Sequence, residues 1–288
     1  MTGGTSGFGR AALDLLLAES DVPIVLGARR PADLAAVPTT QLHTLPLDLS
    51  SLGSVRSFCA RLPSGSISVL ALNAGMTGRK LKTTRDGFEQ MFQVNYLAHF
   101  LMIRLLASRL GNSSRIILTG SGTHDPEEKA PPPAPNHCDV ERLAYPETDP
   151  QRDRFPPRAA GRAYTASKLC CIMLARQLAK IDPAVTSMSF DPGFLPDTDL
   201  ARDFPGPVRW LAKALVPKLL PADRTGTIPT SARAYADMIM VTPPPFASGD
   251  YVSMRGGQPI VVEPSVLARD EKAGERLWQQ TNALLPAG

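Results

Sequence analysis

The sequence predicts an α/β fold, a doubly wound parallel sheet with helices on both faces. Short apolar runs alternate with longer segments of helical periodicity along the whole chain, which is the pattern of strands separated by helices. A glycine-rich turn stands directly before the first of these helical segments. No internal repeat and no linker interrupts the 288 residues, so residues 1–288 are expected to form a single domain.

Each element follows from one of these segments. Strands are expected at the short apolar runs, over residues 22–28, 42–49, 67–72, 115–120, 184–190 and 250–254. Helices are expected between and after them, over residues 8–19, 51–62, 84–110, 161–181, 224–240 and 265–284. Because strand and helix alternate, the sheet is predicted to be parallel and covered on both faces.

Two regions break the alternation. Residues 124–160 contain the run PPPAP and a second proline pair, and because proline disfavours helices and central strands, we expect an insertion loop at the surface. Residues 194–222 hold the short amphipathic stretch VRWLAKALVPKLL between prolines. We interpret this stretch as a lid over a substrate pocket, with a helix lying on a membrane surface as the alternative.

The composition argues against several classes of protein. The net charge is only +4 and the basic residues are spread along the chain, so no nucleic-acid partner is expected. No signal peptide and no window of about 18 apolar residues is present, so no integral membrane segment is expected. The four cysteines show neither disulfide-framework nor zinc-site spacing, which predicts reduced thiols, no metal site and a cytoplasmic location.

The chain opens with the stretch MTGGTSGFGR. Small residues there allow a tight turn and close approach to a ligand, and the helix that follows would direct its first N–H groups at an anion. This arrangement suits a dinucleotide pyrophosphate, and a glycine turn without a ligand is the alternative. Such a turn normally follows a strand, so the first strand is expected to be missing at the N-terminus. Our hypothesis is that a GTG valine codon was read as the start, which makes Met1 a truncation point.

The next predicted strand ends in Ala28-Arg29-Arg30. Sites selective for NAD place an acidic residue there, whereas arginine suits the 2′-phosphate of NADP. No Asp or Glu occurs at 26–32, so we predict NADP (NADPH) as the cofactor. The alternative for Arg29 is an exposed charge at the end of a strand.

The stretch YTASK places Tyr164 and Lys168 on one face of a helix. To exchange protons near neutral pH, a phenol must shift its pKa by about three units, and a neighbouring ammonium can supply much of that shift. Ser121 follows a predicted strand and can hydrogen-bond a substrate carbonyl. Asn95 lies within a predicted helix, where asparagine is a poor helix former, so it serves either a water network or a structural bond.

The ordered set of glycine loop, NAG at 73–75, Asn95, Ser121, Tyr164 and Lys168 resembles the short-chain dehydrogenase/reductase family, which has an extended Rossmann fold. The resemblance implies a catalytic tetrad of Asn95, Ser121, Tyr164 and Lys168. It also implies a set of cofactor-binding residues: Thr2, Gly3, Thr5, Ser6, Gly7, Phe8, Gly9, Arg29, Asp48, Leu49, Asn73, Ala74, Gly75, Tyr164, Lys168, Pro192, Gly193 and Thr198. In this set Asp48 would contact the adenine, Lys168 would hold the nicotinamide ribose, and the Pro192-Gly193 turn would pass beside the nicotinamide.

Longer segments, including YTASKLC and DPGFLPDTDLARD, resemble the branch that holds retinol dehydrogenases and light-dependent protochlorophyllide reductases. The latter carry a cysteine that Cys170 matches, and a buried small residue is the alternative for Cys170. The resemblance implies an NADPH-dependent oxidoreductase that transfers hydride to a carbonyl or activated double bond of a bulky hydrophobic substrate. Candidate pocket residues are Phe155, Phe194, Phe204 and Trp210.

Three expectations are left open beside this one. The chain could be a protochlorophyllide reductase-like enzyme, or an NADP-binding sensor or scaffold that uses the fold without turnover. The family commonly assembles through two long helices, and the predicted helix 84–110 is apolar on one broad face. A homo-oligomer is therefore a candidate assembly.

Overall fold

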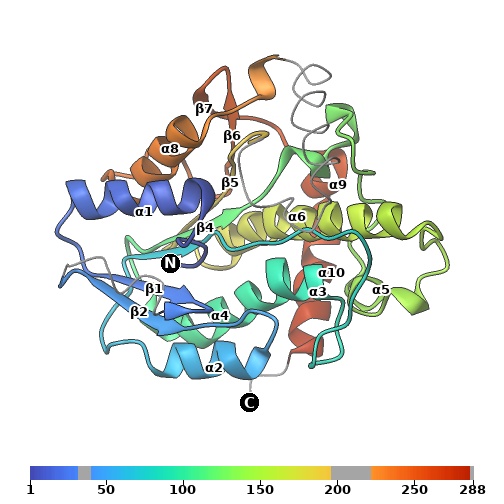
Figure 1. Cartoon of the computed structure of the whole chain (residues 1–288), viewed down its shortest axis with the longest axis horizontal. Helices are drawn as coiled ribbons and strands as arrows, with labels where there is room; N and C mark the ends of the chain where they lie inside the picture. Colours follow the sequence, from blue (N-terminus) through green and yellow to red (C-terminus); the bar gives the residue numbers. More distant parts are fainter. Residues whose placement is uncertain (32–39, 196–221, 286–288) are drawn as a thin grey trace.

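A computed structural model describes residues 1–31, 40–195 and 222–285. Helices cover both faces of a mostly parallel sheet in these residues, as the sequence predicted (Figure 1). The strands are β1 (Ile24–Ala28), β2 (Leu42–Pro46), β3 (Val69–Leu72), β4 (Arg115–Thr119), β5 (Thr186–Asp191), β6 (Tyr251–Arg255) and β7 (Gln258–Val261). Strands β1 and β2 pair with each other, and β3 to β7 follow in sequence order, with β7 alone antiparallel.

Met1 and Thr2 lie between the two parts of the sheet. Thr2 forms parallel bridges to Gly27 of β1 and to Leu72 of β3. Its N–H donates to Ala71 O at 2.9 Å, and the Gly27 N–H donates to Met1 O at 3.0 Å. The first strand was expected to be missing, and this two-residue bridge occupies its position between β1 and β3 among the described residues. The bridge sets the glycine loop directly at the carboxyl ends of β1 and β3.

Helices α1 (Gly7–Glu19) and α8 (Ile228–Met240) lie side by side on one face of the sheet (Figure 1). The other face is covered by α2 (Leu52–Ala60), α4 (Ala98–Leu106), α6 (Pro156–Ile181) and α10 (Glu271–Leu284). Strand β4 contributes side chains to the hydrophobic cores on both faces of the sheet, because successive side chains of a strand point to opposite faces. Ile117 packs with α1 and α8, whereas Ile116 and Leu118 pack with the helices of the other face.

The predicted strands are confirmed with ends that shift by a few residues, but β7 was missed. Gly256 and Gly257 both adopt positive φ, 55° and 79°, and form the tight turn that reverses the chain between β6 and β7. A Gly-Gly pair between two short runs is a recognised hairpin signal, so the sequence contained the evidence for this strand.

The predicted helix 84–110 was wrong in its first part. Gly87 adopts a φ of 89° within a turn, and its N–H donates to Thr84 O. The helix begins only at α3 (Gln90–Phe92), passes through a π-helical turn, η2 (Gln93–Leu97), and continues as α4. The apolar face suggested for an oligomer contact packs against α10 within the chain, where the rings of Phe100 and Trp278 lie 5.0 Å apart.

Three further helix boundaries differ from the predictions. Helix α6 begins at Pro156 because prolines are accepted in the first turn, where their missing N–H is not needed. Helix α8 begins directly after its N-cap Thr227, which forms a capping box with Thr230 in the first turn. The predicted helix 265–284 is divided into α9 (Val266–Arg269) and α10, since Asp270 caps the start of α10 with its carboxylate.

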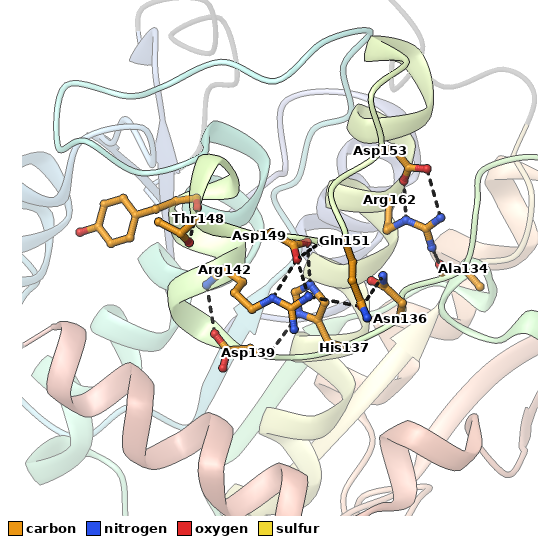
Figure 2. Close-up of polar contacts among 11 residues, drawn as sticks. Ala134, Asn136, His137, Asp139, Arg142, Thr148, Asp149, Gln151, Asp153 and Arg162 are labelled. Carbon is orange, nitrogen blue, oxygen red and sulfur yellow. Dashed lines mark hydrogen bonds and ion pairs between the residues drawn. The ribbon is translucent and has the colours of Figure 1, made fainter.

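Residues 124–160 are not a plain surface loop as expected. They contain η5 (Pro126–Glu128), α5 (Val140–Ala144) and η6 (Pro146–Thr148), after the short turn η4 (Gly122–His124). Three side chains of α5 are buried, and α5 lies against α10. Figure 2 shows Arg142 paired with Asp149, which also contacts His137 at 3.2 Å. These buried and paired groups give the insertion a defined structure. No helix in the described part of the chain is long and apolar enough to cross a membrane.

Candidate active site

A cavity of about 1110 Å³ opens at the carboxyl ends of the parallel strands, where ligands bind in open α/β sheets. Most of the residues predicted from the sequence line it: Thr2, Gly3, Thr5, Ser6, Gly7, Phe8, Gly9, Arg29, Asp48, Leu49, Asn73, Ala74, Gly75, Ser121, Tyr164, Lys168, Pro192 and Gly193. Asn95 lies behind this wall. Thr198, Phe204, Trp210 and most of the predicted lid 194–222 lie outside the described residues.

The glycine loop packs tightly against the end of β3. A Cβ on Gly9 would lie 2.2 Å from Gly3 O and 2.3 Å from Asn73 Nδ2. Asn73 Nδ2 donates to Gly3 O at 2.9 Å, and the Ala74 N–H donates to the Thr2 hydroxyl at 3.0 Å. Only glycine therefore fits at position 9, and the loop is held at the edge of the cavity by groups distant in the sequence.

This loop leads into a helix terminus that suits an anion. Ser6 is the N-cap of α1, and its side chain makes no capping hydrogen bond. The first N–H groups of a helix have no partner within the helix, so they are available to a phosphate group. The cavity wall and the uncapped terminus together fit a dinucleotide.

Arg29 and Asp48 stand at the ends of neighbouring strands on the same side of the cavity. Arg29 is exposed and directly follows β1. The Asp48 carboxylate accepts hydrogen bonds from the Ser50 N–H at 3.0 Å and the Ser50 hydroxyl at 2.7 Å. Asp48 thus shapes its own loop, while Arg29 is the cation at this end of the cavity.

Tyr164 and Ser121 both line the cavity, and the Ser121 hydroxyl accepts hydrogen bonds from the Thr123 N–H at 3.3 Å and the Thr123 hydroxyl at 3.0 Å. Burial raises the pKa of Tyr164 to about 12, and the neighbouring Ser121 hydroxyl opposes this shift. The expectation that Lys168 would lower this pKa is not met in the structure. The Lys168 ammonium donates to Thr119 O at 2.9 Å, and burial lowers its own pKa. Desolvation therefore has the largest influence on the pKa of the phenol.

Asn95 holds two parts of the site together. Its Oδ1 accepts from the Met76 N–H at 2.8 Å, and its Nδ2 donates to Met76 O at 3.0 Å and to the Ser167 hydroxyl at 2.9 Å. The side chain therefore makes the structural bonds that the sequence analysis held as one of two options. The π-helical turn η2 carries Asn95 to a point where an added Cβ on Gly75 would lie 3.4 Å from Asn95 Oδ1 and 3.2 Å from Lys168 Nζ.

Two polar residues of the site were missed by sequence reasoning. His99 is buried one helical turn after Asn95, and its ring contacts the Thr2 hydroxyl at 3.2 Å and Asn95 O at 3.0 Å. Asp191 ends β5 and lines the cavity. A carboxylate at a strand end directly before Pro192-Gly193 was a usable signal, whereas nothing in the sequence singles out His99.

The proline run 131–133 forms part of the cavity wall. This run lies against α6, where an added Cβ on Gly161 would be 2.9 Å from Pro133 Cδ. The Thr165 hydroxyl donates to Pro133 O at 2.7 Å. Figure 2 shows Arg162 between Ala134 and Asp153, and its guanidinium bonds both. The wall is therefore fixed to the helix that carries Tyr164.

Two of the predicted lining phenylalanines also border the cavity, Phe155 and Phe194. Phe155 is 65% exposed, so it stands at the mouth of the cavity. Cys170 is fully buried on α6 and does not border the cavity. Burial raises the pKa of its thiol well above the ordinary value, which agrees with the interpretation of Cys170 as a small core residue.

Comparison with known proteins adds a family. A family model described as short chain dehydrogenase matches residues 1–129. The chain is 31% identical over 310 residues to polyprenol dehydrogenase of Danio rerio, a match that covers 99% of this chain and 85% of the relative. It is 30% identical over 256 residues to human retinol dehydrogenase 13, covering 83% and 67% of the two chains.

The chain is also similar to a longer plastid enzyme. It is 32% identical over 225 residues to the chloroplastic protochlorophyllide reductase of Chlamydomonas reinhardtii, with 70% of this chain and 56% of the relative covered. Two other curated relatives are likewise longer, and the match spans 64% and 60% of their lengths. A short chain dehydrogenase of Burkholderia cenocepacia, solved in complex with NADP, superimposes with a TM-score of 0.63 at 19% identity, covering 89% of this chain and 95% of the other. That likeness supports the fold.

Proposed function

Since the chain belongs to the short-chain dehydrogenase family, we propose that it is an NADPH-dependent oxidoreductase that reduces a carbonyl or activated double bond of a bulky hydrophobic substrate. The branch with retinol dehydrogenases and protochlorophyllide reductases, expected from the sequence, is confirmed by the relatives. The names of three relatives refer to a polyprenol, a retinol and a protochlorophyllide. All three are bulky and largely apolar molecules, which supports the same substrate class here.

One observation carries the proposal. Tyr164, Ser121 and Lys168 line the same cavity as the glycine loop and the start of α1. A proton donor and a dinucleotide cradle thus share one cavity. When bound, NADPH would supply the hydride.

Each polar residue then has a definite task. Ser121 would bind and polarise the substrate oxygen, and Tyr164 would donate a proton to that oxygen. Burial raises the pKa of Tyr164 to about 12, so the phenol is protonated at neutral pH, and proton transfer would require the positive charges of Lys168 and the oxidised nicotinamide to lower that pKa. Lys168 would hold the nicotinamide ribose. Asn95 fixes the chain at Met76 and Ser167, and so would keep Lys168 and Tyr164 in register with the cofactor.

One feature favours NADPH over NADH as the cofactor. A second feature favours reduction of a carbonyl over a protochlorophyllide reductase-like reaction. Arg29 is an exposed cation at the cavity, suited to a 2′-phosphate. Cys170 lies in the core and away from the cavity, so it is poorly placed to act in a protochlorophyllide reductase-like enzyme. An intact Ser121, Tyr164 and Lys168 set supports turnover over a role as a sensor or scaffold.

Substitution of Tyr164 by Phe tests the assigned role. Loss of the phenol proton should lower the rate of NADPH oxidation with all-trans-retinal or decanal about 10²- to 10⁴-fold. The dissociation constant for NADPH, followed by nucleotide fluorescence, should stay within about twofold, since the phenyl ring keeps the packing. Equal loss of turnover and NADPH binding would contradict the role given to Tyr164. Failure of the wild-type chain to bind either nucleotide would reject the proposed function.

A further inference from the structure

A buried carboxylate, Asp191, lines the cavity at the end of β5, directly before the Pro192-Gly193 turn. The side chain is only 4% exposed, yet it lines the cavity. Its Oδ1 accepts from the Gly193 N–H at 3.0 Å, and its Oδ2 accepts from the Ser253 hydroxyl at 2.8 Å and the Tyr251 hydroxyl at 3.2 Å. An added Cβ on Gly122 would lie 3.2 Å from the same Oδ2. Asp191 is therefore adjacent both to the turn after β5 and to the segment that carries Ser121.

All three donors to Asp191 are neutral. Among the residues that the structure describes, no lysine or arginine forms an ion pair with it. The three hydrogen bonds satisfy the carboxylate oxygens but bring no positive charge to them. Because an unpaired ion is costly to bury, a structural role alone would be met better by an uncharged acceptor. The retained charge points to a role in the reaction.

The other charged groups nearby do not cancel this charge by direct pairing. Glu128 pairs with Arg224 and with Arg255, the latter at 2.7 Å. Lys168 points its ammonium at Thr119 O. His124 is buried, and burial lowers its pKa, so its ring is neutral near pH 7. Among the described residues, Asp191 and Lys168 influence each other electrostatically, but neither forms an ion pair.

We propose that Asp191 is a positioning residue whose fixed negative charge stabilises the oxidised, cationic form of the bound nicotinamide cofactor and so favours carbonyl reduction over alcohol oxidation. This inference rests on the proposed function. Asp191 also holds the Pro192-Gly193 turn through the Gly193 N–H, and this turn is the part of the chain that would pass beside the nicotinamide.

The charge balance of the reaction gives the direction of the effect. Reduction takes one hydride from NADPH to the carbonyl carbon and one proton from Tyr164 to the oxygen, and the phenol is then reprotonated from solvent. The carbonyl becomes an alcohol, and the nicotinamide ring changes from neutral to singly positive. A nearby negative charge in a buried site lowers the free energy of the positive ring. Burial is the main cause of the raised pKa of Tyr164, and the negative charge of Asp191 raises that pKa further. The phenol is therefore protonated before the reaction.

Nucleotide binding tests this inference without turnover. For the full chain at pH 7.5, NADPH binding is followed by fluorescence, and NADP⁺ binding by competition with NADPH. For Asp191→Asn, the ratio of the NADP⁺ to the NADPH dissociation constant should rise roughly tenfold over wild type, because one negative charge is removed from the buried wall of the cavity. Asp191→Ala also removes the negative charge. It is the second variant to measure if Asp191→Asn does not fold.

Ser253→Ala is the matched control, because it removes one donor to Asp191 and leaves the charge in place. Its ratio should remain that of wild type. An unchanged ratio in both Asp191 variants, or an equal rise in Ser253→Ala, would overturn the inference while leaving the proposed function intact. Wild-type protein that binds neither nucleotide would instead reject the proposed function.

Discussion

His99 offers a quantitative test of how the fold supports the glycine loop. Its ring is 1% exposed and joins Asn95 O to the Thr2 hydroxyl. Since a carbonyl only accepts, Nδ1 carries the proton and Nε2 accepts from Thr2. Burial lowers the pKa of His99 from its ordinary value of 6.5 to about 4, and the charge of Lys168 adds to the effect.

The pKa of the folded state lies below that of the unfolded state, so the unfolded chain binds more protons. The stability associated with a neutral His99 is present above pH 6.5 and is lost as the pH falls through about 4. At pH 5 the loss should be about 2 kcal/mol, and well below pH 4 it should approach about 3 kcal/mol. Replacement of His99 by Gln removes the titration and keeps a polar side chain of similar length.

Urea unfolding at pH 7.5 and pH 5.0, followed by circular dichroism, measures this difference. At pH 7.5 His99→Gln should cost about 1–2 kcal/mol through weakened hydrogen bonds. Between the two pH values the wild type should lose about 2 kcal/mol more than the variant, since all other titrating groups are shared. His43 is exposed, and His43→Gln should follow the wild type. Parallel pH dependence of wild type and His99→Gln would refute the reasoning.

Two glycines give further expectations. Gly9→Ala should weaken NADPH binding at least tenfold in a fluorescence titration, because its Cβ would lie 2.2 Å from Gly3 O and would displace the loop from Asn73. Gly161→Leu should lower the free energy of unfolding in urea by about 1–3 kcal/mol, since the new side chain would push against Pro133 and overpack the proline wall.

Gly53 supplies the controls for both substitutions. It lies exposed on α2, and an added Cβ would meet only Ser51 Oγ at 3.8 Å. Gly53→Ala should therefore keep NADPH binding, and Gly53→Leu should be neutral or slightly stabilising, because both residues are better helix formers than glycine. Wild-type affinity in Gly9→Ala would contradict the packing given for the loop. If Gly161→Leu has the same free energy of unfolding as the wild type, the proline wall can move to admit the larger side chain without loss of stability, and the packing argument is wrong.

The parts of the site that were predictable depend on short-range geometry. Tyr164 and Lys168 are four residues apart on a helix, so their common face follows from the helical repeat alone. The ends of parallel strands gather at one edge of a sheet, so Ser121 and Asn73 could be expected beside the glycine loop. The proline pair at 156–157 was misleading, because its effect depends on whether it falls in the first turn or the interior of a helix.

The sequence by itself determined the alternation of strands and helices, the glycine turn and the order of the reactive residues, because these are written in local periodicity and spacing. Only the tertiary structure decided which partners the polar groups have. Asn95 bonds Met76 and Ser167, His99 bonds Thr2, and Asp191 accepts from residues of β6. Desolvation and hydrogen bonding between residues far apart in the chain set the charge of a buried group, so the raised pKa of Tyr164 and the unpaired charge of Asp191 emerge only when the chain is folded.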